Sequence, residues 1–344
     1  MNPKNYTRTI LDIDVIEMRQ LEKINSFIAF RDLFILYFFT IFIVSLGIYL
    51  TVEFSWFFYP LVIFFIAGRQ GAFLQLIHEA SHNLISENYK INNFFGSWLT
   101  SFLVGVNFEG YTSGHKSHHS SVSTPEEPEA DSEKYVTVDF KSVRIYFLFL
   151  KDLLGITALK IFFDYGNNKS GEKFSTKVNF LSSKKIFFLF KLSIVQLLIL
   201  ALFKFNIFYY FFFWLYPAMG PHMFLMRIRG IAEHGLSKQM SYLVTSPAEG
   251  MYFTRSFLTK VNTYKYFNIL NIVEKLLIGS FSVHYHHEHH LNARIPYYNL
   301  KKFHKLTKDQ IINKVKVPIY EKGYFSAALR TVLVPESELT YKFY

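Results

Sequence analysis

Long apolar blocks separated by short polar stretches dominate the chain. A transmembrane helix needs about 20 apolar residues to cross the hydrocarbon core of a bilayer. Four blocks approach that length, and we expect them to span a membrane: residues 33–50, 54–77, 186–203 and 207–226. The sequence TVEF links the first two blocks, and a few residues around Lys204 link the last two. Each pair is therefore expected to form a hairpin.

Two hairpins place the N-terminus, the middle loop and the C-terminus on one side of the membrane. Basic residues flank the apolar blocks on that side, at Arg31, Lys184, Lys185, Arg227 and Arg229. The opposite turns carry only Glu53 and Lys204. Because Lys and Arg concentrate in cytosolic loops, we expect both termini to be cytosolic. The pattern predicts an all-α integral membrane protein of four transmembrane helices, with a cytosolic helical cap from residues 78–185 and 227–344.

The whole chain, residues 1–344, is expected to form a single membrane domain. Residues 94–108 are apolar but short and contain two glycines, so they predict an interfacial or re-entrant helix. Residues 136–165 mix apolar and charged positions, which predicts amphipathic helices on the membrane surface. Residues 166–185 are polar and predict a loop.

Composition supports a membrane protein that depends on an external electron source. Half of the residues are hydrophobic (51%), and they fall in long blocks, which indicates membrane spans. The net charge is +11, and the Lys and Arg residues lie between apolar blocks. This placement indicates residues that orient the chain in the membrane and contact anionic headgroups, rather than a nucleic-acid binding surface. The chain has no cysteine for an iron–sulfur cluster and no G-x-G-x-x-G for a nucleotide cofactor. Any electrons it uses must come from a partner.

Thirteen histidines are present, and most of them fall in three clusters just outside apolar blocks. The clusters are HEASH at 78–82, HKSHH at 115–119 and HHEHH at 286–290. Positions i, i+3 and i+4 share one face of a helix, so each cluster presents several imidazoles together: His78 and His82; His115, His118 and His119; His286, His289 and His290. Together with His234, they are too many for one metal ion and suit two. Imidazole binds Fe, Cu, Zn and Ni, so ligand type alone does not select the metal.

The segments HEASH, HKSHH and HYHHEHH resemble the three histidine boxes of the membrane fatty-acid desaturase family, within the di-iron desaturase and hydroxylase superfamily. STPEEPEADS after the second box and HHLNARIPYYNL after the third resemble that family too. The resemblance extends from about residue 55 to residue 305. Three boxes in order, among four apolar blocks, make it specific.

This resemblance implies two ferrous ions and O₂ as co-substrate, acting on an unactivated C–H bond of a lipid or fatty-acyl chain, with desaturation as the expected reaction. The implied iron ligands are His78, His82, His115, His118, His119, His234, His286, His289 and His290. It also implies a cytosolic active site and an external donor, either ferredoxin or cytochrome b5 with its reductase. No His-Pro-Gly-Gly occurs, so no cytochrome b5 module is fused to the chain. We expect no catalytic residues beyond the metal ligands.

Two other functions are compatible with parts of the sequence. The same histidine boxes serve hydroxylases, here of a lipid, a sphingolipid or a carotenoid-like substrate. The HEASH segment alone resembles a zinc protease motif with Glu79 as general base, which predicts an intramembrane metalloprotease. That interpretation lacks a further ligand motif and leaves seven other histidines unexplained.

Acidic side chains near the clusters are candidates to accept N–H bonds from ligand imidazoles and to fix their tautomers. The candidates are Glu79, Glu288, Glu233 and Asp131. His284 and His287 lie off the shared helix face, so we expect them not to bind metal. His222 is expected to pack in the interior, whereas His304, among lysines, is expected to be solvated.

Overall fold

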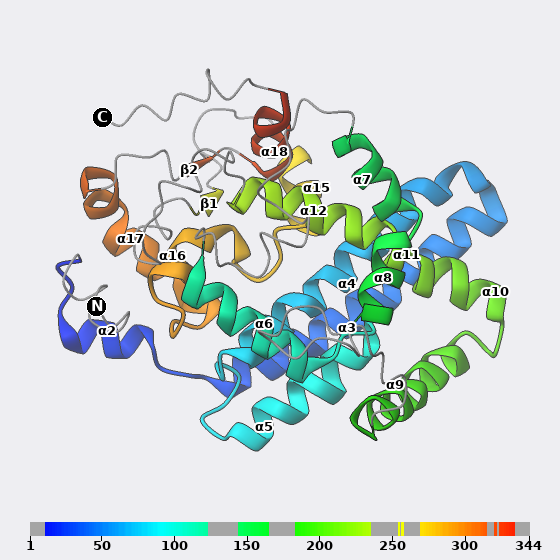
Figure 1. Cartoon of the computed structure of the whole chain (residues 1–344), viewed down its shortest axis with the longest axis horizontal. Helices are drawn as coiled ribbons and strands as arrows, with labels where there is room; N and C mark the ends of the chain where they lie inside the picture. Colours follow the sequence, from blue (N-terminus) through cyan, green and yellow to red (C-terminus); the bar gives the residue numbers. More distant parts are fainter. Residues whose placement is uncertain are drawn as a thin grey trace. The chain divides into compact units, whose positions relative to one another are not determined.

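A computed structural model describes residues 11–122, 144–164, 183–234, 254, 256–257, 269–314, 320–321 and 323–333 (Figure 1). The regular elements among these residues are helices, apart from two short parallel strands, β1 (Ser256–Phe257) and β2 (Tyr320–Glu321). The chain divides into two compact units: unit 1 contains Met1–Asn25, His115–Tyr146 and Met226–Tyr344, and unit 2 contains Ser26–Gly114 and Phe147–Leu225. Of the polar segment 166–185, residues 166–182 lie outside the described part.

Unit 2 contains the long apolar helices. Its elements are α3 (Ser26–Tyr49), η1 (Leu50–Phe54), η2 (Trp56–Phe58), α4 (Tyr59–Ser81), α5 (Tyr89–Phe94), η3 (Phe95–Thr100), η4 (Ser101–Leu103), α8 (Ile156–Asp164), α9 (Ser183–Leu202), α10 (Ile207–Tyr210), η5 (Phe211–Leu215) and α11 (Tyr216–Met219). Three helices have residues in both units: α6 (Phe108–Ser121), α7 (Arg144–Leu153) and α12 (Pro221–His234).

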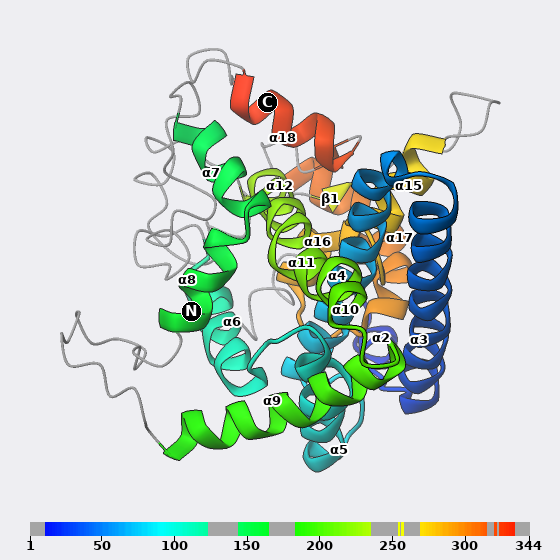
Figure 2. The same ribbon diagram turned by 90° about the vertical axis from the view of Figure 1, so that its right-hand side faces the viewer.

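Three segments in the described part of the chain are long and apolar enough to cross a membrane: Val15–Phe54, Trp56–Ser81 and Lys185–Leu202. They overlap the first three apolar blocks and indicate a membrane protein. Figure 2 shows α3 as one long, unbroken helix. The π-helical turn η1, the extended Ser55 and the 3-10 turn η2 join it to α4, and Tyr37 of α3 contacts Phe73 of α4.

The fourth apolar block is not one continuous helix. It comprises α10, the π-helical turn η5, α11 and the start of α12. Gly220 leaves the helical conformation because the next residue is Pro221, which lacks an N–H and disfavours helical geometry in the residue before it. A side chain at Gly220 would meet the backbone of Leu153. The number of spans and the two-hairpin topology therefore remain predictions.

Side chains satisfy the backbone groups that these irregular turns expose. Gln70 of α4 donates to the carbonyl of Trp214 in η5 at 2.8 Å, and Trp214 in turn donates to the carbonyl of Leu103. Gln196 of α9 donates to the carbonyl of Phe102 at 2.6 Å. Such partners make broken helices tolerable in a membrane protein, because bilayer lipid offers none.

The shorter predicted segments are helical in part, and residues 136–143 lie outside the described part of the chain. Residues 94–108 contain the end of α5, the turns η3 and η4, and a Gly105 with φ of +74°, so the apolar stretch is interrupted. Residues 144–164 form α7 and α8. In α7, Ile145 is buried while Phe147 is exposed, which is typical of a helix with two different faces.

Unit 1 carries most of the histidines on helices held by a separate apolar core. Its further elements are α2 (Val15–Leu21), α15 (Ile269–Leu277), η7 (Val283–Tyr285), α16 (His286–Leu291), α17 (Tyr297–Lys314) and α18 (Tyr324–Leu333). The core joins α2, α16 and α17 (Figure 1) through residues such as Leu21, Leu291 and Phe303. Asn299 donates to the carbonyl of Leu21 at 2.8 Å and fixes α2 to the start of α17.

Candidate metal centre

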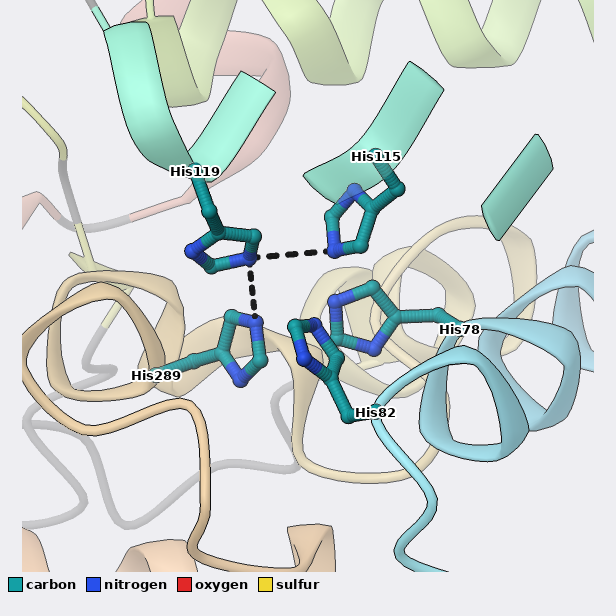
Figure 3. A group of neighbouring side chains, drawn as sticks. All are labelled: His78, His82, His115, His119 and His289. Carbon is teal, nitrogen blue, oxygen red and sulfur yellow. Dashed lines mark hydrogen bonds between the residues drawn. The ribbon is translucent and has the colours of Figure 1, made fainter. Parts of the chain in front are cut away.

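The first histidine cluster lies at the end of α4, in unit 2. His78 is in the last turn and His82 is the C-cap residue, so the two rings lie one turn apart with centroids separated by 4.9 Å. Nδ1 of His78 is 3.3 Å from a carboxylate oxygen of Glu79. Both rings are labelled in Figure 3. The spacing of the HEASH motif thus places two imidazoles on one side of α4, as predicted.

Three histidines of unit 1 converge through their Nε2 atoms. His115 and His119 are one turn apart in α6, and His289 projects from α16 (Figure 3). Nε2 of His119 lies 3.0 Å from Nε2 of His115 and 3.0 Å from Nε2 of His289. The second and third boxes, whose His119 and His289 are 170 positions apart in sequence, therefore face one another.

Four further histidines of unit 1 converge in the same manner. Nε2 of His286 lies 2.7 Å from Nε2 of His234 and 3.0 Å from Nε2 of His290. Nε2 of His290 is also 3.4 Å from Nε2 of His118. These side chains come from α6, the last turn of α12 and α16, and all four are buried. The structure thus brings His234 beside the second and third boxes.

The convergent Nε2 atoms fit a shared metal ion. A neutral imidazole has one donor and one acceptor nitrogen, so several Nε2 atoms that face one point cannot all satisfy one another. Two ligands at right angles, each about 2.1 Å from a metal, lie about 3.0 Å apart, and the observed separations of 2.7–3.4 Å bracket that value. The ligand atoms of His118, His234 and His290 all lie within 4.8 Å of one another.

Burial keeps at least one of these histidines neutral. Desolvation holds the pKa of His290 well below its usual value, and the neighbouring imidazoles of His119, His286 and His118 lower that pKa further. A neutral imidazole has a free lone pair for a metal, whereas an imidazolium does not. The site is therefore prepared to bind a cation without first releasing a proton from His290.

Comparison with known proteins agrees with this geometry. A model of the fatty acid desaturase family matches residues 54–321, which include the three histidine boxes and His234. The chain belongs to the fatty acid desaturase family. It is also similar to dihydrorhizobitoxine desaturase of Bradyrhizobium elkanii, with 23% identity over 262 residues that cover 73% of this chain and 68% of the relative. Family membership supports an oxidoreductase and does not favour the protease interpretation.

Glu233 is a buried acidic residue beside these histidines. Its Oε2 is 3.7 Å from Nδ1 of His286, while Arg229 donates from Nε to both carboxylate oxygens at 2.8 and 2.9 Å. Burial raises the pKa of Glu233, and Arg229 and the Tyr324 hydroxyl oppose that rise. Its carboxylate also forms a possible metal-binding group with His234 and His286. Arg229 is detectable in sequence as an i, i+4 partner of Glu233, whereas Tyr324 carries no such signal.

Glu288 and His304 form a buried pair, so the prediction of a solvated His304 is wrong. His304 is 9% exposed, and its Nδ1 lies 2.6 Å from Oε1 of Glu288, which is fully buried. Ser256 donates to the other carboxylate oxygen. The neighbouring lysines of α17 suggested solvent, but His304 lies on the face that packs against α16. These contacts tie α16 to α17 and β1.

The remaining candidates are three histidines outside the clusters of convergent Nε2 atoms and one aspartate. Nδ1 of His287 is 2.9 Å from the Thr254 hydroxyl. Burial lowers the pKa of His284 to about 4, with Lys275 adding to the effect. His222 is buried, as predicted. Among the described residues, none of these three histidines belongs to a possible metal-binding group. Asp131 lies outside the described residues.

Proposed function

We propose that the chain holds two iron ions and uses O₂ to desaturate a lipid or fatty-acyl chain. The proposed iron ligands are His78, His82, His115, His118, His119, His234, His286, His289 and His290. The convergence of seven Nε2 atoms within unit 1 is the observation that carries the proposal. Family membership supports adding the two histidines of α4 to that set.

Desaturation is favoured over hydroxylation because the matching family and the relative both carry that reaction in their names. Removal of two neighbouring hydrogen atoms gives an alkene. O₂ accepts two electrons from the substrate and two from a donor, and with four protons it leaves as two water molecules. When bound, the two ferrous ions would supply the O₂ chemistry and the oxidising power for this step.

The protein's own residues would provide ligands, tautomers and a dry site. The imidazoles present Nε2 inward, so Nδ1 is left to carry the ring proton and to meet an acceptor. Glu79 lies near Nδ1 of His78, and Glu233 lies near Nδ1 of His286. Carboxylates in such places fix ring orientation and raise ligand basicity. Burial of His118, His234 and His290 would limit water near the reacting bond.

The substrate and the donor are proposed at the level of chemical class. The three apolar segments suit access to a lipid within a membrane. The relative is named for dihydrorhizobitoxine rather than for a fatty acid, so the product test must also detect other substrates. We propose a separate donor, ferredoxin or cytochrome b5 with its reductase, because the chain has no cysteine for an iron–sulfur cluster.

We also propose the arrangement in the membrane that the sequence predicts. The chain would form a single domain of residues 1–344, with four spans in two hairpins. Its histidine-bearing cap and both termini would lie in the cytosol. The basic flanks of the apolar blocks support this orientation.

The test expresses the chain with a ferredoxin and its reductase and analyses total lipid esters by gas chromatography–mass spectrometry. We expect a new unsaturated product, reduced at least about 100-fold in His118→Ala because a proposed ligand is lost. Lys116→Ala, an exposed neighbour on α6, should leave the product unchanged. A hydroxylated product would show that the reaction is hydroxylation instead of desaturation. Purified protein that holds zinc and no iron after iron-replete growth would overturn the proposal.

A further inference from the structure

A buried tyrosine near the end of the chain reaches the Glu233 carboxylate. We propose that Tyr324 is a positioning residue, whose hydroxyl holds Glu233 in place beside Nδ1 of His286. The inference rests on the proposed function and deepens it. Tyr324 lies beyond residues 54–321, so it is outside the segment that matches the family.

The contacts leave the Glu233 carboxylate little freedom. Tyr324 is 2% exposed, and its hydroxyl donates to Oε1 of Glu233 at 3.2 Å. Arg229 donates to both oxygens of the same carboxylate from the preceding turn of α12. Two donors on different helices therefore fix the position and the plane of the carboxylate, while Oε2 remains 3.7 Å from Nδ1 of His286.

The orientation of the His286 ring places its Nδ1 on the side of the Glu233 carboxylate. Nε2 of His286 faces the Nε2 atoms of His234 and His290, so its lone pair points to the proposed metal side. Nδ1 then carries the ring proton and points to Glu233. At 3.7 Å the carboxylate is beyond direct hydrogen-bond distance, so its charge is what favours the proton on Nδ1. Loss of carboxylate partners of ligand histidines weakens metal binding by about 10- to 100-fold.

A second carboxylate, that of Glu274, fixes the backbone next to Tyr324. Glu274 of α15 accepts the N–H of Phe325 at 2.9 Å and so satisfies a free donor at the start of α18. At Gly323, a Cβ atom would lie 2.6 Å from Oε2 of Glu274, so a glycine permits this close approach. Because α15 fixes the first turn of α18, the Tyr324 ring has a defined direction toward Glu233.

The test measures metal binding rather than turnover. The purified full-length chain is freed of iron by chelation and titrated with Co²⁺, whose visible absorption reports both affinity and ligand geometry. We expect Tyr324→Phe to weaken binding of one of two Co²⁺ equivalents by about 10-fold or more and to shift its absorption bands. Tyr298→Phe is the matched control, because it also removes one tyrosine hydroxyl contact of unit 1, with the N–H of Asn25.

A second variant distinguishes positioning from a general loss of packing. Glu274→Ala should weaken binding of the same Co²⁺ equivalent although Tyr324 is intact. The double variant should bind Co²⁺ no more weakly than Tyr324→Phe alone, because both substitutions act through the contact between Tyr324 and Glu233. Wild-type affinity in Tyr324→Phe would overturn the inference while the proposed function stands. Equal weakening in Tyr298→Phe would also overturn it. A wild-type chain that binds no Co²⁺ would remove both the inference and the proposed metal centre.

Discussion

His304 shows how one side chain can support the histidine boxes without binding metal. Its Nδ1 meets a fully buried carboxylate, that of Glu288 within the third box. We expect His304→Leu to destabilise the fold by roughly 3 kcal/mol or more, because it leaves the buried Glu288 carboxylate without its imidazole partner. The melting temperature of the purified protein measures this effect.

The side chain at position 304 allows a conservative control. Asparagine places an N–H donor near the position of Nδ1, so His304→Asn should recover part of the lost melting temperature. Lys305→Ala, an exposed neighbour on α17, should leave it unchanged. Equal melting temperatures in His304→Leu and the wild type would show that the pair contributes nothing to stability.

The helix faces of the histidine boxes could be predicted from sequence, but their partners could not. The spacing of His115 and His119 fixes their shared face on α6, because helical geometry is local. The contacts of Glu233 with Tyr324 and of Glu288 with His304 join residues 91 and 16 positions apart. Such contacts depend on how the helices pack together, which the spacing of residues within one helix does not predict.

The start of α18 provides a test at the scale of helices. Burial raises the pKa of Glu274, although the N–H groups of Phe325 and Tyr324 lower it in part. A carboxyl whose pKa is raised in the folded state stabilises the fold below its unfolded pKa, and that contribution is lost as pH rises through the folded pKa. Glu274→Gln keeps an acceptor for Phe325 and removes the charge.

We therefore expect Glu274→Gln to melt at a higher temperature than the wild type at about pH 8, and the difference to narrow toward about pH 4.5. Comparing the two proteins at each pH cancels the titration of the shared histidines. A difference that is the same at both pH values would show that Glu274 is not the titrating group.

At the scale of elements, the fourth apolar block shows what hydropathy does not predict, namely whether an apolar segment is one continuous helix. Its length and composition predict one span over residues 207–226, and its interruption follows from Pro217, Gly220 and Pro221, which are visible in the sequence. Hydropathy counts apolar residues and ignores backbone geometry, whereas proline removes a donor and restricts its neighbour. The π-helical turn η5 has no comparable sequence signal.

For the whole molecule, the positions of the histidine boxes constrain the number of membrane crossings. His119 precedes α9 and His289 follows it, yet their Nε2 atoms lie 3.0 Å apart within unit 1. The second and third boxes must therefore lie on the same side of a membrane. If α9 crosses once, the chain must cross a second time before residue 286. The interrupted block at residues 207–226 is the apolar segment placed to do so.

This argument predicts which positions a membrane-impermeant maleimide reaches in intact cells. The chain has no cysteine, so each single variant carries one thiol. Glu53→Cys, in the exposed turn η1, should be labelled from outside, whereas Lys151→Cys and Lys301→Cys should be labelled only after lysis. All three positions are exposed. Labelling of Lys301→Cys but not Lys151→Cys in intact cells would mean an odd number of crossings between the two positions. It would place the second and third boxes on opposite sides of the membrane, which the proposed metal centre does not allow.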